Sequence, residues 1–237
     1  MQISVQYVSA GTTVAATLRR FAHRNGLSLA VFGLFLLFLI AESVVGSFAY
    51  NSDRQDHGLP ALSYAQFLTS GRFIESTAEN WESEFLEMSF YVLLTSFLYQ
   101  RGSAESKSPD GSEESEGSSA AAGKARPPWP VRRGGWVLWL YAHSLSTALL
   151  ILFLIAFLIH ASGGVHDYNL SQLEHGKPAV TLLQFMATSE FWFQSFQNWQ
   201  SEFLGLGSMI VLSIFLRQRG SPESKPVEAP HSQTGKA

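Results

Sequence analysis

Two segments of the chain are nearly identical: ENWESEFLEMSFYVLLTSFLYQRGSAESK, residues 79–107, and QNWQSEFLGLGSMIVLSIFLRQRGSPESK, residues 197–225. Each begins with the motif Asn-Trp-x-Ser-Glu-Phe, continues through an apolar stretch and ends in Gln-Arg-Gly-Ser. Shifting the chain by 118 residues aligns 50–107 with 168–225, and 25 of these 58 positions are identical. Self-similarity of this length predicts two copies of one supersecondary unit.

Four apolar stretches predict membrane-spanning helices. Residues 27–50 carry one charge, Glu42, and residues 136–162 carry no Lys, Arg, Asp or Glu. Both exceed the roughly 20 residues that cross a bilayer. The repeated segments have shorter apolar cores, but they become spans of about 80–100 and 198–217 if their tryptophans, Trp81 and Trp199, anchor them in the headgroup region.

A cleavable signal peptide is the alternative for the first stretch, because Ser47-Phe48-Ala49 resembles a cleavage site. The long N-terminal arm and the corresponding stretch in the second half favour a span.

Upstream of the aligned region 50–107, the string LFLIA occurs at 37–41 and again at 152–156, 115 residues later. This smaller shift predicts that about three residues were gained within or after the helix.

The predicted fold class is all-α: an integral membrane four-helix bundle made of two tandem helical-hairpin repeats. Each repeat has an even number of spans, so both copies enter the membrane in the same direction and the pseudo-two-fold axis is parallel to the membrane normal. The expected parts are an N-terminal arm (1–26), a first hairpin repeat (27–101), a disordered linker (102–134), a second hairpin repeat (135–219) and a C-terminal tail (220–237).

Basic residues predict the orientation. The arm, linker and tail, counted with the adjoining helix ends at Arg101, Arg217 and Arg219, together hold 13 Lys and Arg. The loops inside the two hairpins hold 3, namely Arg54, Arg72 and Lys177. This asymmetry places both termini and the linker in the cytoplasm. The expected location is therefore the cell inner membrane, with multiple passes. Arg101 and Arg219 are expected to anchor the cytoplasmic ends of the repeated helices.

The candidate intramembrane polar site consists of two repeat-related pairs, Asn80 with Glu84 and Asn198 with Glu202. Within each pair the residues lie one helical turn apart on the same face. Facing carboxylates would share a proton or hold a cation. The alternatives are acids at the water interface, where the helix dipole favours them, and a polar clasp between helices.

Three further residues are secondary candidates. Glu87 lies one turn beyond Glu84, but its counterpart in the second copy is Gly205. Glu42 and His160 align under the 118-residue shift, and could form an ion pair or proton relay, although interfacial solvation is the favoured interpretation. The loop histidines His57 and His175 show no ligand spacing, so no metal site is expected.

Several classes of function are disfavoured. The chain has no cysteine and a net charge of -3, so neither thiol chemistry nor nucleic-acid binding is expected. Nucleophile, phosphate-loop and zinc-protease motifs are missing from the sequence. We therefore expect no catalytic residue, no cofactor and no enzyme activity.

The two motifs and the His-Gly-x-Pro loops resemble a family of small bacterial integral membrane proteins of unknown function, over about residues 26–225. That resemblance implies membrane location and bacterial origin, and no activity. The expected function is a non-enzymatic scaffold or binding protein of the bacterial inner membrane. The alternative is a small cation or proton conduit that uses Glu84 and Glu202. Expected partners are the lipid bilayer and either a second copy or another membrane protein.

Overall fold

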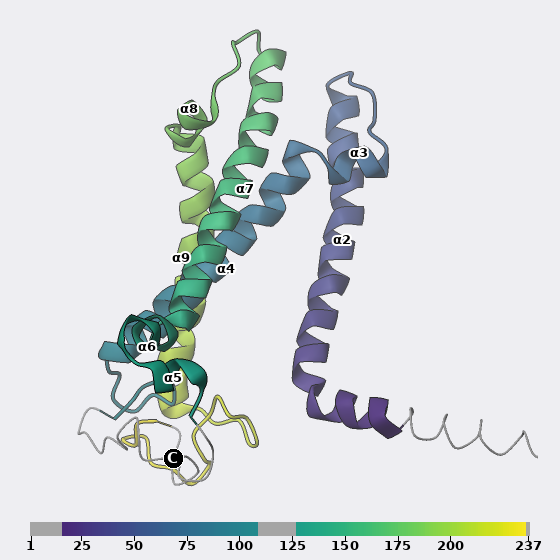
Figure 1. The fold of residues 1–237 in the computed structure, drawn as a ribbon. Coiled ribbons are helices and arrows are strands. Elements are labelled where there is room, and N and C mark those ends of the chain that lie inside the picture. The colour runs from purple at the N-terminus through teal and green to yellow at the C-terminus, as the bar shows by residue number, and fades with distance from the viewer. Residues whose placement is uncertain (1–15, 109–126, 236–237) are drawn as a thin grey trace, which may run out of the picture. The chain divides into compact units, whose positions relative to one another are not determined.

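The computed structural model describes residues 16–108 and 127–235, and within these ranges all regular structure is helical (Figure 1). The expected all-α class is therefore confirmed for the described residues. The chain separates into two compact units, with the boundary between Thr69 and Ser70. This boundary lies inside the range expected for the first hairpin. Parts of the expected arm and linker, residues 1–15 and 109–126, lie outside the described residues.

The first unit contains a long helix, α2 (Gly26–Asp56), and a short one, α3 (Tyr64–Leu68). The loop between them is held by the side chain of Asn51, which accepts from the backbone N–H of Leu62 at 2.7 Å and donates to its carbonyl at 2.9 Å. Ser63 then caps α3 in a capping box with Gln66, satisfying N–H groups that the helix itself leaves unpaired. The amide of Asn51 and this cap turn the chain back after α2.

The second unit is built on three long helices. Its elements are α4 (Gly71–Phe97), α5 (Trp129–Arg133), α6 (Gly135–Ala142), α7 (Ser144–Glu174), α8 (Leu182–Met186) and α9 (Ser189–Phe215). Helix α4 packs against both α7 and α9 (Figure 1). The stretch expected as one span, 136–162, is interrupted at His143, where α6 ends and α7 begins.

Helix bounds in the later part of the chain follow those in the earlier part at a constant offset. Helices α2 and α7 both have 31 residues, and α4 and α9 both have 27. The starting residues of each pair are 118 positions apart, as are those of α3 and α8. The predicted gain of three residues near LFLIA is therefore wrong. That string recurs at a shorter distance because both helices are rich in Leu, Ile and Ala.

The two Gln-Arg-Gly-Ser loops also have the same hydrogen bonds. The N–H of Gln100 donates to Ser106 Oγ at 2.8 Å, and the N–H of Gln218 donates to Ser224 Oγ at 2.9 Å. Gly102 and Gly220 have φ of 84° and 82°, a conformation that only glycine adopts at little cost. The motif is thus a specific loop that follows each of the two helices.

The beginning of the expected linker and the expected tail are ordered against each other. Ser103 Oγ lies 3.0 Å from Ser213 Oγ at the end of α9. Lys225 is buried, and its ammonium donates to four backbone carbonyl oxygens, those of Gly102, Pro230, His231 and Gln233. Burial, and then the nearby Arg217 guanidinium, lower the pKa of Lys225. Residues 102–108 therefore form part of a packed loop.

Glycines allow α4 and α7 to cross at close range. A Cβ atom on Gly71 would lie 2.6 Å from the carbonyl oxygen of Gly163, and a Cβ on Gly163 would lie 2.6 Å from the backbone N of Glu75. Real Cβ atoms do not approach backbone this closely. The crossing therefore requires small residues, as close helix contacts in membranes commonly do.

Replacing Gly163 with alanine tests this crossing. Alanine is favoured over glycine in a helix by about 1 kcal/mol, but at this position it would overpack the contact, at a cost of about 1–3 kcal/mol. We expect Gly163→Ala to lower the thermal unfolding temperature in detergent. The control is Gly205→Ala in α9, where a new Cβ would have no atom within 4 Å. That control should unfold at the same or a higher temperature, and equal shifts in the two variants would contradict the proposed contact.

Candidate functional site

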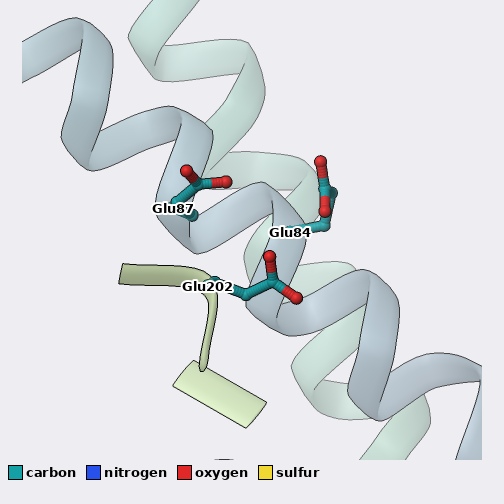
Figure 2. Close-up of side chains that lie close together, drawn as sticks. All are labelled: Glu84, Glu87 and Glu202. Atoms are coloured by element: carbon teal, nitrogen blue, oxygen red, sulfur yellow. The ribbon is translucent and has the colours of Figure 1, made fainter. Parts of the chain in front are cut away.

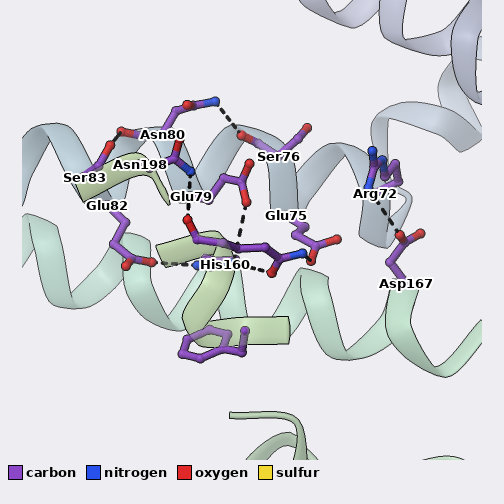
Figure 3. A network of polar contacts seen from close by, with 12 residues as sticks. Arg72, Glu75, Ser76, Glu79, Asn80, Glu82, Ser83, His160, Asp167 and Asn198 are labelled. Carbon is purple, nitrogen blue, oxygen red and sulfur yellow. Dashed lines mark hydrogen bonds and ion pairs between the residues drawn. The ribbon is translucent and has the colours of Figure 1, made fainter. Parts of the chain in front are cut away.

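A fully buried histidine and a fully buried acid form the centre of the second unit (Figure 3). His160 on α7 and Glu82 on α4 are both 0% exposed, and His160 Nδ1 lies 2.7 Å from Glu82 Oε2. The indole N–H of Trp199 on α9 donates to the other carboxylate oxygen of Glu82 at 2.9 Å. All three long helices of the unit therefore meet at one carboxylate.

The second ring nitrogen of His160 also has a partner. Its Nε2 lies 3.3 Å from the amide oxygen of Gln194, whose amide nitrogen donates to Glu75 at 2.9 Å. Because an amide oxygen and a carboxylate are both acceptors, both ring nitrogens of His160 act as donors. This is the hydrogen-bonding pattern of a charged imidazolium. The geometry therefore describes an ion pair between His160 and Glu82.

A second acid completes the charge around the imidazole. Glu79 Oε2 lies 3.9 Å from His160 Nε2, and the amide of Asn198 donates to the backbone carbonyl of Gln194 at 3.3 Å (Figure 3). The sequence placed both Asn80 and Asn198 in the candidate site, and of the two it is Asn198 that contacts this group of residues. Asn80 does not: it is exposed, and its amide donates to the carbonyl of Ser76 at 2.8 Å.

The cluster continues towards the N-terminal end of α4. Glu75 is 4% exposed, and its carboxylate lies so close to Gly164 that a Cβ there would be 2.9 Å from it. Beyond it, Arg72 on α4 lies 3.9 Å from Asp167 on α7. We call Glu75, Glu79, Glu82, His160 and Gln194 the buried cluster.

The predicted acids Glu84 and Glu202 lie close together, on the C-terminal side of the buried cluster (Figure 2). Glu87 joins them, and one oxygen of each of the three carboxylates lies within 4.8 Å of the others. We call these three residues the glutamate triad. Ser83 Oγ donates to Glu202 at 3.5 Å, which connects the triad to α4 beside Glu82. Glu84 is exposed, whereas Glu87 is buried.

Other predicted residues differ from expectation. The favoured interfacial solvation of His160 is wrong, because its side chain is enclosed and bonded to Glu82. Glu42 lies on α2 in the first unit, whereas the partner of His160 comes from α4. Trp199 points its N–H at a buried carboxylate, an inward role that differs from a headgroup anchor. Trp81, Arg101 and Arg219 are exposed.

Sequence reasoning missed three acids, Glu75, Glu79 and Glu82. Their spacing of four and then three residues places them on one face of a helix, which was a detectable signal. The repeat does not identify them, because these acids align with Phe193, Gln197 and Gln200 in the second copy. The buried cluster thus uses residues that differ between the two copies.

Two long apolar helices indicate the class of the protein. Helices α2 and α7 are each long and apolar enough to cross a membrane, and only 28% of the most apolar window of α7 is buried. Together with the all-α fold, they indicate a membrane-associated helical protein. The chain belongs to the family described as domain of unknown function DUF6766, whose model matches residues 18–236. The expected resemblance to a family without an assigned function is confirmed. No curated protein and no solved structure matches the chain.

Proposed function

We propose that this protein is a multi-pass membrane protein whose second unit conducts protons across the bilayer. The observation that carries the proposal is a row of protonatable side chains along α4, from Glu75 to Tyr91, which His160 of α7 and Glu202 of α9 join. Within membranes, acids and histidines are rare and costly, and rows of them mark proton pathways. We infer an inner-membrane location in bacteria with both termini cytoplasmic, as the positive-inside pattern predicts.

The first part of the row is the buried cluster. The imidazolium of His160 donates the proton on Nδ1 to Glu82 across 2.7 Å, which leaves a neutral ring. When the remaining proton of this ring moves from Nε2 to Nδ1, Nε2 accepts a new proton from Glu79, which lies 3.9 Å away and one helical turn beyond Glu75. Each step moves one proton from a donor to a neighbouring base, so the row returns to its starting state after a proton leaves at the other end.

The second part of the row runs through the glutamate triad. Ser83 connects α4 to Glu202, and the triad carboxylates approach one another within 4.8 Å. Tyr91 lies one helical turn beyond Glu87, and its hydroxyl donates to Glu105 in the first Gln-Arg-Gly-Ser loop. The expected topology places this loop in the cytoplasm. The row would therefore connect the two sides of the membrane.

The length and the exposed side chains of α4 and α9 support the proposal that these two helices cross the membrane. With 27 residues each, α4 and α9 are about 40 Å long, which exceeds the roughly 30 Å of bilayer hydrocarbon. Among the described helices, only α2 and α7 are identified as spans from length and mean hydropathy alone. Helices α4 and α9 are more polar. Some of the polar residues that lower their hydropathy are buried, among them Glu75 and Glu82 on α4 and Ser195 on α9. The exposed side chains include Trp81, Phe90 and Leu93 on α4 and Phe193, Phe196, Leu204 and Leu212 on α9.

The architecture that we propose is two tandem helical hairpins, α2 with α4 and α7 with α9. It is supported by the constant offset of the helix bounds and by the matched loop and cap hydrogen bonds. A pseudo-two-fold axis along the membrane normal follows from two hairpins of the same orientation. The proton row then breaks this symmetry, because α4 supplies most acids and α7 supplies the histidine.

Proton flux into liposomes tests the conduit. Purified full-length protein in vesicles with an internal pH dye, an imposed potassium gradient and valinomycin should acidify the lumen. The double variant Glu84→Gln, Glu202→Gln and the single variant Glu82→Gln should reduce flux to that of protein-free vesicles, because an amide cannot relay the proton. The control Glu228→Gln removes an exposed acid of the tail and should retain wild-type flux.

Helical circular dichroism of each variant in detergent distinguishes a blocked row from an unfolded protein. If Glu82→Gln fails to fold, the double variant still decides, because Glu84 and Glu202 are not fully buried. Wild-type flux in a folded double variant, or no flux in the wild-type protein, would show that the protein is not a proton conduit of this kind.

A scaffold or lipid-binding role is the second candidate, and it rests on the two Gln-Arg-Gly-Ser loops. Their hydrogen bonds match, and Arg101 and Arg219 are both exposed at corresponding positions. Basic residues beside a span attract anionic headgroups, by about 1 kcal/mol each. Replacing both arginines with glutamine should reduce the anionic lipid that co-purifies, measured by mass spectrometry. An unchanged lipid content would exclude these loops as the lipid site.

A further inference from the structure

The geometry points to a divalent-cation site of the calcium class at the glutamate triad, formed by Glu84 and Glu87 of α4 and Glu202 of α9. The sequence predicted no metal site at the loop histidines, although it allowed a cation between the facing carboxylates of Glu84 and Glu202. Cation binding also differs from proton transfer along the row, because a bound cation needs all three carboxylates ionised at the same time. Three observations carry it.

The first observation is the convergence of three carboxylates from two helices. One oxygen of each lies within 4.8 Å of the others (Figure 2). Calcium binds oxygen ligands at about 2.3–2.6 Å, so two ligands on opposite sides of the ion lie about 4.6–5.2 Å apart. The spread of the triad therefore fits an ion of this size without moving the helices. Magnesium prefers shorter distances of about 2.0–2.1 Å and usually keeps several of its waters, so calcium is the better match.

The second observation is that the buried member of the triad has no partner. Glu87 is 7% exposed, yet among the described residues its carboxylate makes no hydrogen bond or salt bridge. The charges that act on it are those of Glu84 and Glu202, which are of the same sign. Buried carboxylates are normally paired, hydrogen-bonded or bound to a metal. A cation between the three acids supplies the missing charge.

The third observation is access. Glu84 is exposed and Glu202 is half-buried, so an ion can reach the triad and complete its coordination with water. Calcium takes six to eight oxygen ligands, of which the three carboxylates supply between three and six. The counterpart of Glu87 in the second copy is Gly205, where a Cβ would meet no atom within 4 Å. Among the described residues the repeat therefore forms one such site, which should bind one ion per chain.

Binding is tested with Mn²⁺ as a paramagnetic probe for the full-length protein in detergent. Electron paramagnetic resonance should show one Mn²⁺ bound per chain, and Ca²⁺ should displace it. Glu87→Gln should abolish binding, and Glu84→Gln, at an exposed position, should do the same without disturbing the packing. The matched control Glu190→Gln removes an exposed acid of α9 outside the triad and should retain the ion.

Two results would overturn the assignment: no Mn²⁺ bound to the wild-type protein, or full binding by folded Glu84→Gln and Glu87→Gln. Displacement by Na⁺ as effectively as by Ca²⁺ would also overturn it, because it would replace the divalent class with a monovalent one. The binding measurement does not depend on proton conduction, so Mn²⁺ binding without flux would leave this inference standing while the proposed function fails. Flux without Mn²⁺ binding would do the opposite.

A consequence for conduction rests on the proposed function. A cation at the triad holds its carboxylates ionised and occupies the stretch of the row between Ser83 and Tyr91. Ca²⁺ should therefore inhibit wild-type flux in liposomes.

Discussion

The charge pair between His160 and Glu82 is the interaction on which the second unit depends. Both side chains are fully buried, and removing two charges from water is costly unless each finds its partner in good geometry. Here the carboxylate is satisfied by the imidazole of α7 and the indole of α9. These bonds fix which faces of the three helices meet, because rotating any one of them would leave a buried charge unpaired. The glycine crossing at Gly163 and Gly71 then brings α4 and α7 close enough for the pair to form.

The repeat and the polar interior of the unit have separate physical origins. Matching caps, loops and helix lengths give the two copies the same backbone, whereas the buried cluster consists of residues at which the copies differ. Glu82 aligns with Gln200, and His160 aligns with Glu42. The two copies thus share the same backbone arrangement. The residues that differ between them, Glu82 and His160, place opposite charges next to each other. The glutamate triad combines both origins, since Glu84 and Glu202 match and Glu87 does not.

Much of the fold could be predicted from the sequence, because the repeat, the apolar runs and the turn residues are local signals. The all-α class and the long helices α2 and α7 follow from them. The starts of α4 and α9 were less accessible, because each helix begins nine residues before the expected span, at a cap formed by Ser70 or Thr188. In the candidate site, the proximity of Glu84 to Glu202 was predicted from their equivalence. The partner of His160 was not, because a pairing between α4 and α7 leaves no trace in spacing along the chain.

The pair itself can be measured directly. Solid-state NMR on protein labelled with ¹⁵N in histidine rings and ¹³C in glutamate carboxyls reports the distance from His160 Nδ1 to the Glu82 carboxyl carbon. The account predicts a nitrogen–carbon contact below about 4 Å, as a short hydrogen bond requires, which disappears in Glu82→Gln. A spectrum without that contact, or with one that persists in the variant, would contradict it.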